Sequence, residues 1–168
     1  MLRALAVLER ADRRERLSVI RSEMAHAMER GCGIYRLGNE LLNTCEKLDE
    51  LVERCDRVGL DSHSRVYNTE WLLAIELGYQ LDVARAMAHS ALERRESRGA
   101  HQRLDGYERR DDVHFLKHSL AIHTGGSGCP PRITYGAVRI THSAPAERAY
   151  GAEGESMGSA SAASGGPA

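Results

Sequence analysis

The sequence predicts a mostly α-helical protein, an antiparallel three-helix bundle followed by a small β-hairpin and a disordered tail. Three observations support this fold class. Apolar residues recur every three to four positions in three successive stretches, as they do along one face of a helix. A glycine-rich turn between short apolar runs then predicts a hairpin. The chain finally ends in Gly, Ser and Ala without periodicity, which is typical of disorder.

The first predicted helix covers residues 16–30 and ends at Gly31 and Gly33, because glycine is common just after a helix. The second is expected to begin at Asn39, whose side chain can cap a helix N-terminus. Its apolar stripe runs to Cys55 and includes a second cysteine, which would behave there as a small hydrophobic side chain.

The third predicted helix is the longest. Asn68 or Thr69 can cap its start, and it is expected to run through about Arg95 and to stop at Gly99. Its apolar residues become small toward the C-terminal half, where alanines allow a neighbouring helix to approach closely. Short connections between the three helices favour antiparallel neighbours.

The hairpin is predicted from two apolar segments on either side of the turn at residues 124–128. Val113–Leu116 and Leu120–Ile122 are interpreted as one extended run, with Ile133–Tyr135 and Val138–Ile140 as its partner. A single hairpin is barely stable by itself, so it must lie on the bundle or on another domain.

These elements divide the chain into three segments. Residues 1–15 form an N-terminal helical extension. Residues 16–150 form the helical domain, with the bundle at about 16–98 and a charged loop and hairpin at about 99–142. Residues 151–168 form the disordered tail of Gly, Ser and Ala.

Bulk composition excludes several function classes. The net charge is −1, from 23 cationic and 24 acidic residues, so neither nucleic acid nor an anionic membrane surface is an expected partner. No apolar run is long enough for direct insertion into a membrane. The four cysteines match no zinc or iron–sulfur spacing, and a reduced, cytoplasmic compartment fits them.

The most informative segment runs from Glu93 to Asp112, where six arginines and six carboxylates interleave and cancel. A balanced set of this kind favours a paired network at a contact between domains or subunits, although a solvated charge run is the alternative. Arg98 is the central candidate because it directly precedes Gly99, where the backbone can turn tightly. The candidate interface residues are Glu96, Ser97, Arg98, His101, Arg103, Asp105, Asp111, Asp112 and His118.

No catalytic, cofactor-binding or metal site is predicted in this chain. Ser97 and His101 lack an oxyanion loop or nucleophile elbow. His114 and His118 would lie about 13 Å apart along a strand, too far to share a metal. The glycines of residues 125–128 open no helix and so cannot form a nucleotide loop.

Several motifs occur in an order that resembles a known family. They are Gly31–Arg36, Asn68-Thr69-Glu70 with Ile75–Gly78, Ala88–Ala91, Glu96–His101 and Arg148–Gly151. Over roughly residues 16–151 the sequence resembles the C-terminal domain of the flavoprotein subunit of fumarate reductase and succinate dehydrogenase. It is more similar to the bacterial fumarate reductase branch than to the related aspartate oxidases. His89, His101 and His118 each match a histidine of the family and are interpreted as structural partners of the charged network.

The resemblance implies a subunit that interconverts fumarate and succinate in anaerobic respiration or the citric acid cycle. FAD would be bound by the full-length subunit, and electrons would pass through an iron–sulfur subunit to membrane quinone. The family's flavin and substrate motifs are missing from this sequence, so the chain alone is expected to bind no FAD and to be inactive. The pair Gly106-Tyr107 departs from the family's usual Tyr-Pro, and Cys129-Pro130-Pro131 has no family counterpart.

Two interpretations of the chain's role remain. As a C-terminal piece of the flavoprotein subunit it would dock the flavin-binding domain and the iron–sulfur subunit. It would then be peripheral at the inner face of the plasma membrane through those partners. Alternatively, it is a free-standing helical interaction module of the same descent that binds a partner subunit or assembly factor. A domain of a larger subunit should expose a contiguous apolar patch, whereas an independent module should not.

Overall fold

The computed structural model describes residues 6–9, 15–125 and 129–142. Residues 1–138 form one compact unit and residues 139–168 a second. The first unit is mostly helical, as the sequence predicts, and includes two small two-stranded sheets, one of which is the predicted hairpin. The predicted tail at residues 151–168 lies outside the described residues.

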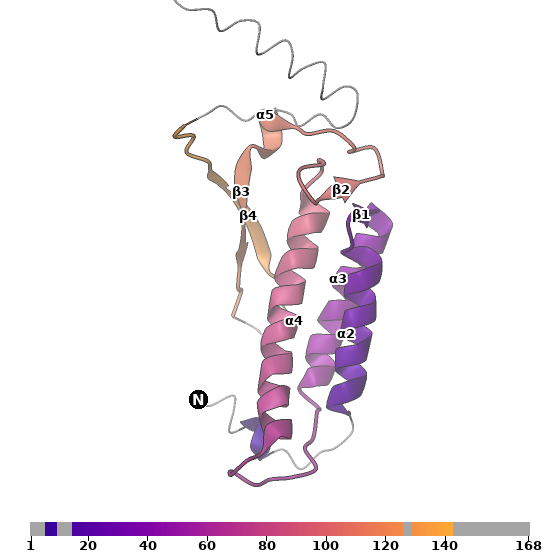
Figure 1. The fold of residues 1–168 in the computed structure, drawn as a ribbon, viewed down its shortest axis with the longest axis vertical. Helices are drawn as coiled ribbons and strands as arrows, with labels where there is room; N and C mark the ends of the chain where they lie inside the picture. Colours follow the sequence, from indigo (N-terminus) through magenta and orange to yellow (C-terminus); the bar gives the residue numbers. More distant parts are fainter. Residues whose placement is uncertain (1–5, 10–14, 126–128, 143–168) are drawn as a thin grey trace, which may run out of the picture. The chain divides into compact units, whose positions relative to one another are not determined.

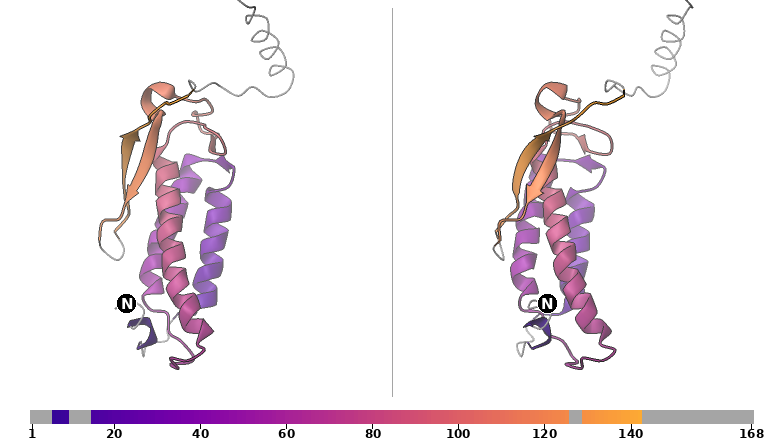
Figure 2. Two further views of the ribbon diagram at one scale, coloured as in Figure 1. Left: turned by 60° about the vertical axis from the view of Figure 1, so that its left-hand side comes forward. Right: turned by 90° about the vertical axis from the view of Figure 1, so that its left-hand side faces the viewer.

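Three long helices lie side by side in the first unit (Figures 1 and 2). They are α2 (Leu17–Gly31), α3 (Gly38–Cys55) and α4 (Thr69–Glu93). α3 packs along both of the others, and their facing stripes form the main core. The fully buried side chains at its centre are Ile20, Leu48, Leu51, Leu77 and Leu81. The predicted periodicity of all three helices is therefore confirmed.

The two cysteines of α3 lie in this core, as their positions in the apolar stripe predict. Cys45 is 2% exposed and Cys55 is 8% exposed. Burial raises the pKa of the Cys45 thiol to about 12, so this thiol stays protonated and unreactive. Both side chains act as packing residues.

α2 and α3 meet closely where α2 ends. A Cβ atom on Gly31 would lie 2.0 Å from Thr44 Oγ1 and 2.9 Å from the Glu40 carbonyl oxygen, so only glycine fits at this point. The Thr44 hydroxyl donates a hydrogen bond of 3.2 Å to the carbonyl of Ala27. Gly31 thus ends α2, as predicted, and also permits the close packing of α2 on α3.

The predicted cap of α3 at Asn39 is wrong. α3 begins at Gly38 with Leu37 as the N-cap residue, and no Leu37 side-chain bond closes this end. The carboxylate of Asp105 instead accepts a hydrogen bond of 2.8 Å from the Gly38 amide. A partner 67 positions along the chain therefore replaces the local cap that the sequence favoured.

α4 starts as predicted and ends slightly early. Asn68 is its N-cap residue and accepts a hydrogen bond of 3.0 Å from the Trp71 amide. The helix ends at Glu93, so its extension through Arg95 is wrong. Arg94 is already extended, because its guanidinium group turns away from the helix and donates to the carbonyls of Phe115 at the end of α5 and Lys117 at the start of β3. Gly99 does not stop the helix, but its φ of +60° forms a later turn.

The hairpin consists of β3 (Lys117–Ile122) and β4 (Arg132–Ala137), paired antiparallel with Leu120 opposite Thr134. It packs along α4, which confirms that the hairpin lies on the helices. Figure 2 shows this arrangement from two sides. β4 ends at Ala137, so the prediction that Val138–Ile140 continues the strand is wrong. Residues 138–140 have no strand partner in the β3–β4 register.

The first part of the predicted extended run is also wrong. Residues Asp112–Phe115 form the short helix α5. Asp111 caps it, because its side chain accepts hydrogen bonds from the amides of Val113 at 3.1 Å and His114 at 3.0 Å. The largely apolar residues 113–116 suggested a strand, but the Asp111 cap favours a helical turn instead.

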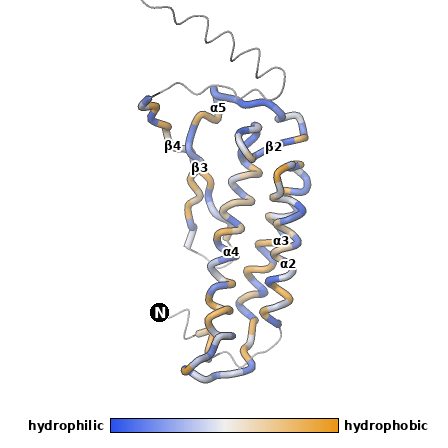
Figure 3. The backbone as a smooth tube through the Cα atoms, in the orientation of Figure 1, coloured by the Kyte–Doolittle hydropathy of each residue, from blue (hydrophilic) through white to orange (hydrophobic). Residues whose placement is uncertain are grey.

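A second, two-residue sheet joins distant parts of the chain. β1 (Tyr35–Arg36) pairs in parallel with β2 (Gln102–Arg103), with Arg36 opposite Arg103. This pairing holds the charged segment over the end of α2 and the start of α3. The tube coloured by hydropathy shows the stretch between α4 and α5 as mostly hydrophilic (Figure 3).

Within the described part of the chain, no helix has both the length and the apolar content needed to cross a bilayer.

Candidate functional site

Glu96 is the centre of the charged segment and is fully buried. Its Oε1 accepts hydrogen bonds from Arg94 and, at 2.8 Å, from Arg98 Nε. Its Oε2 accepts from Arg98 Nη2 at 2.9 Å and from the Asp111 amide at 2.8 Å. A carboxylate with this many charged donors is stable without water. Glu96 therefore ties the end of α4 to the start of α5.

Asp112 extends the network toward the surface. Its Oδ1 accepts from Arg98 Nη2 and its Oδ2 accepts from Arg110 Nη2, each at 2.6 Å. The Arg98 and Arg110 guanidinium groups hold the pKa of the Asp112 carboxyl below its ordinary value. The Glu96 carboxylate, with Asp112, raises the pKa of Arg98. The Arg98 side chain is thus held by two carboxylates, while 27% of its surface remains exposed.

Arg103 closes the C-terminal end of α4. It is only 3% exposed. Its Nη1 donates to the carbonyls of Ala91 and Leu92 at 3.2 Å each and to that of Arg94 at 3.3 Å. The last carbonyls of a helix have no partners within it, and a guanidinium group can satisfy several of them at once. Arg103 therefore acts as a remote cap for α4.

Arg103 also forms a bidentate ion pair with Asp105. Nε and Nη2 donate to the two carboxylate oxygens at 2.8 and 2.6 Å, and the guanidinium group lies over the Tyr107 ring with its carbon 5.3 Å from the ring centre. This pairing lowers the pKa of Asp105. The same carboxylate accepts from the Gly38 amide, so one ion pair links the end of α4 to the start of α3.

Ser97 has a structural role in the same loop. Its hydroxyl donates to the Tyr107 carbonyl at 2.8 Å and accepts from the Arg103 amide at 2.8 Å. Its own amide donates to the carbonyl of Arg109 at 3.0 Å. Ser97 is buried, with 7% of the residue exposed, and its hydroxyl already has both a donor and an acceptor as partners. The hydroxyl is therefore not placed to act as a nucleophile.

His101 connects strand β1 to the end of α4. Its Nδ1 lies 2.7 Å from Arg36 Nη1, and its Nε2 lies 3.0 Å from the Arg94 carbonyl oxygen. A guanidinium group can only donate, so Nδ1 must accept and the proton must be on Nε2. Burial, together with the charges of Arg36, Arg103 and Arg94, lowers the pKa of this histidine. The neutral tautomer therefore fits both contacts.

His118 lies apart from this network. It is exposed on β3, opposite Gly136. It lines an open recess of about 430 Å³ together with Arg94, Arg98 and Phe115. His89 also lies elsewhere, with its Nε2 3.6 Å from a carboxylate oxygen of Asp49 on α3. The expectation that His89 joins the charged network is therefore wrong, because α4 directs it toward α3.

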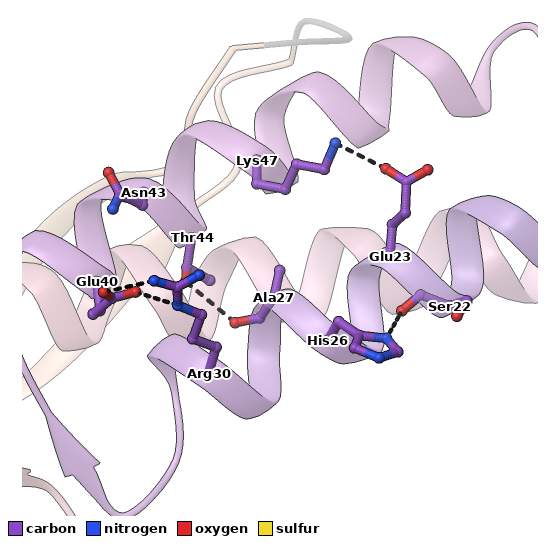
Figure 4. A pocket seen from close by; sticks show the side chains of 9 residues that line it. All are labelled: Ser22, Glu23, His26, Ala27, Arg30, Glu40, Asn43, Thr44 and Lys47. Atoms are coloured by element: carbon purple, nitrogen blue, oxygen red, sulfur yellow. Dashed lines mark hydrogen bonds and ion pairs between the residues drawn. The ribbon is translucent and has the colours of Figure 1, made fainter.

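A larger open groove lies between α2 and α3 and has a volume of about 560 Å³ (Figure 4). Ion pairs cross it, from Arg30 to Glu40 at 2.7 Å and from Lys47 to Glu23 at 2.8 Å. Arg54 and Lys47 lower the pKa of Glu23 to about 2. These charges neutralise one another, so the groove is a salt-bridged seam between two helices and presents no convergent reactive group.

Metal-binding geometry is likewise absent from the described part of the chain, where no three His, Cys, Asp or Glu side chains converge. His114 lies in α5 and its Nδ1 contacts Asp111 at 2.8 Å. The paired side chains of the charged segment are buried around Glu96 and Arg103 and partly exposed at Arg98 and Asp112. We call this set of pairs the charged clamp.

Comparison with known proteins agrees with this architecture. Residues 21–150 match the family described as fumarate reductase flavoprotein C-term. The chain belongs to this family. The fumarate reductase flavoprotein subunit of Haemophilus influenzae is 49% identical over 159 residues, which cover 95% of this chain and 26% of that protein. That of Escherichia coli K12 is 51% identical over 150 residues, which cover 89% of this chain and 25% of that protein.

Solved structures show the same family fold. A chain of an Escherichia coli quinol fumarate reductase has a TM-score of 0.81 at 50% identity, covering 89% of this chain and 25% of that one. A quinol-fumarate reductase with menaquinol molecules has a TM-score of 0.76 at 51% identity, covering 80% and 23%. The chain thus spans about a quarter of the length of the curated relatives it matches. The resemblance inferred from the Glu96–His101 motif and its neighbours is confirmed.

Three residues that hold the charged segment in place were not predicted from the sequence. Arg36, Gly38 and Arg94 hold His101, Asp105 and Glu96, yet none of the three was chosen as a candidate. Arg94 stands in the charged run itself, and Arg36 closes the Gly31–Arg36 motif. That motif was a usable signal for Arg36, whereas nothing local marks the Gly38 amide.

Protonation of His101 should weaken the fold. Its pKa is lowered in the folded state, so the unfolded chain binds this proton at higher pH, near 6.5. The stabilisation is complete above that pH and is lost as the pH falls below it. We expect the urea-derived free energy of unfolding of the wild type to fall as the pH decreases below about 6.5. His101→Gln can accept and donate in the same places without titrating, and should flatten this part of the profile.

Retention of the wild-type pH slope by His101→Gln would show that other groups cause it. The carboxylates with lowered pKa values, such as Glu23, do not confuse the comparison. Their stabilisation is lost only at more acidic pH, as each is protonated below its ordinary value.

Proposed function

We propose that this chain acts as the C-terminal helical domain of a fumarate reductase or succinate dehydrogenase flavoprotein subunit, and that its own role is structural. In this role it packs against the flavin-binding part of the subunit and supports docking of an iron–sulfur subunit. One observation carries the proposal: α4 is apolar on two opposite faces, and only one of them is covered within the described part of the chain.

The covered face of α4 consists of small and branched residues turned toward α2 and α3. They are Leu77, Leu81, Ala84, Ala88 and Ala91, while Ala74 on the same helix packs against Val7, Leu8 and Leu60. On the opposite side, four large residues follow one another at intervals of four or seven positions. They are Leu72, Tyr79, Val83 and Met87, each between 52% and 61% exposed. We call these four residues the outer stripe. A helix that is apolar all round is normally buried on all sides, so this stripe supports a covering partner.

The remaining three quarters of a flavoprotein subunit would supply that partner. In the proposed assembly the domain corresponds to residues 16–150, the three long helices form an antiparallel bundle, and residues 1–15 form an N-terminal extension. FAD is bound by the flavin-binding part of the full-length subunit. The chemistry is that of the flavin, which exchanges electrons between the quinone pathway and the fumarate–succinate pair. This chain positions that part and adds no reactive group.

The charged segment supplies the second contact in this proposal. Arg98, Asp111, Asp112 and His118 each present an exposed edge that an iron–sulfur subunit can meet. The buried members Glu96, Ser97 and Arg103 and the half-buried members His101 and Asp105 fix the shape of that edge from below. The assembly would be peripheral at the inner face of the plasma membrane, through its partner subunits.

The test uses the part of the Escherichia coli flavoprotein subunit that lies outside the region matched by this chain. The purified chain should bind this part and, once the iron–sulfur subunit is added, restore fumarate reduction. The chain alone should show no FAD absorbance. The relative's own matched region serves as the positive control. If that region binds and this chain does not, while the chain is folded and monodisperse, a free-standing interaction module is favoured instead.

Charge placed on the outer stripe should abolish this binding. The double variant Val83→Glu/Met87→Glu is expected to bind the flavin-binding part at least about a hundredfold more weakly, since two buried carboxylates would have no partners. Leu42→Glu is the matched control, because Leu42 is 48% exposed on α3, close to the 52% of Met87, and lies outside the stripe. Isothermal titration measures both, and equal affinities would contradict the proposed docking face.

A further inference from the structure

The loop that leads into α4 holds an unusual residue. Tyr67 has a backbone φ of +55°, in the left-handed region, and a side chain that is 98% exposed. Among the described residues it is the one non-glycine residue with positive φ. A bulky side chain adopts this conformation rarely, because its Cβ atom crowds the following carbonyl. The strain needs a compensating contact, and the exposed ring makes none that repays it within the described chain.

The surrounding loop is built to keep this conformation. The side-chain amide of Asn68 donates to the carbonyls of Ser62 at 2.8 Å and Ser64 at 3.0 Å. Its oxygen accepts from the Trp71 amide, which fixes the loop to the first turn of α4. The Ser64 hydroxyl donates to the Val66 carbonyl at 3.0 Å and accepts from the Val66 amide at 3.1 Å.

Val66 is exposed together with Tyr67, with 66% of its surface accessible. The two side chains therefore project from a loop whose backbone is already ordered. Ordering before binding reduces the entropy lost on association, and a pre-ordered tyrosine is a typical anchor of a protein interface. Tyrosine is suited to this because its ring supplies a large apolar area and its hydroxyl group still finds a polar partner.

We infer that Tyr67, with Val66, is a preformed anchor that inserts into a pocket on the flavin-binding part of the flavoprotein subunit. This inference rests on the proposed function. The choice of occupant follows from continuity: Tyr67 directly precedes the cap of α4, and Leu72, the first residue of the outer stripe, is 54% exposed one turn later. The anchor and the outer stripe thus follow one another along the chain at the start of α4. The relatives are about four times as long as this chain, which supplies the mass to cover it.

The decisive variant is Tyr67→Asn. Asparagine tolerates a positive φ, so the melting temperature of the chain should stay the same or rise, whereas the anchor is lost. Its affinity for the flavin-binding part of the Escherichia coli subunit should fall by at least about tenfold. Tyr67→Phe keeps the ring and should retain most of the affinity. Stability and binding are expected to change independently, which a purely structural tyrosine would not show.

Three outcomes separate the two proposals. Wild-type binding with a tenfold loss in Tyr67→Asn supports the anchor. Wild-type binding with no loss in the variant overturns the anchor and leaves the proposed function intact, as does a lowered melting temperature with unchanged affinity. If the wild type fails to bind while the relative's own region binds, both proposals are wrong. In that last case the Val83→Glu/Met87→Glu variant and the wild type both fail to bind, whereas in the other cases the wild type binds.

Discussion

Replacing Glu96 by alanine should lower the free energy of unfolding by about 3–5 kcal/mol, because it removes a fully buried carboxylate to which two largely buried arginines donate. Arg94 and Arg98 both donate to this carboxylate, and the Asp111 amide loses its acceptor as well. Small domains are stable by only about 5–15 kcal/mol, so the variant should be close to unfolding at room temperature. Urea unfolding followed by circular dichroism measures the difference.

Glu93→Ala is the matched control for Glu96→Ala. Glu93 lies three residues earlier and is exposed, so its removal should change the unfolding free energy by less than about 0.5 kcal/mol. The contrast separates burial from charge, since both variants remove one negative charge from the same segment. A loss below about 1 kcal/mol for Glu96→Ala would mean that water satisfies the two arginines as well as the carboxylate does.

The helices could be predicted from the sequence because their signals are local. The spacing of Leu48, Leu51, Leu77 and Leu81 defines the buried faces without knowledge of what covers them. Asn68 caps α4 with its own side chain three residues from the amide it binds. Both signals lie within one helical turn, so no tertiary information is needed to interpret them.

The charged clamp could be located from the sequence but not resolved into pairs. A balanced run of arginines and carboxylates shows that pairing occurs, yet many pairings are compatible with it. The structure selects Arg103 with Asp105 and Glu96 with Arg98 because β1 and β2 fix the loop over the helix ends. That sheet is two residues long, too short to leave a periodic signal.

The misplaced elements share one cause. α3 begins before Asn39 because Asp105 reaches the Gly38 amide, and α4 ends before Arg95 because Arg94 binds the hairpin. Side chains from elsewhere in the chain thus set these boundaries. Such contacts override local propensity wherever a distant side chain satisfies the backbone groups at a helix end.

Replacing Arg103 by alanine should cost a similar 3–5 kcal/mol, for a different reason. This variant removes the Arg103 donor from the carbonyls of Ala91, Leu92 and Arg94, of which the Arg94 carbonyl keeps its bond from His101, and it leaves Asp105 without its bidentate partner. The effect should reach α3, since the same carboxylate holds the Gly38 amide. We therefore expect faster hydrogen exchange at Gly38 as well as a lower unfolding free energy, although Gly38 and Arg103 are far apart in sequence.

Arg103→Lys tests whether geometry or charge matters. A lysine carries the same charge but cannot bind both carboxylate oxygens and the helix carbonyls at once, so it should recover less than half of the loss. Arg95→Ala, at an exposed arginine near the same helix end, should leave both stability and Gly38 exchange unchanged. If Arg103→Lys matched the wild type, a single positive charge would be enough to hold Asp105. The fork geometry would then not be what joins the end of α4 to the start of α3.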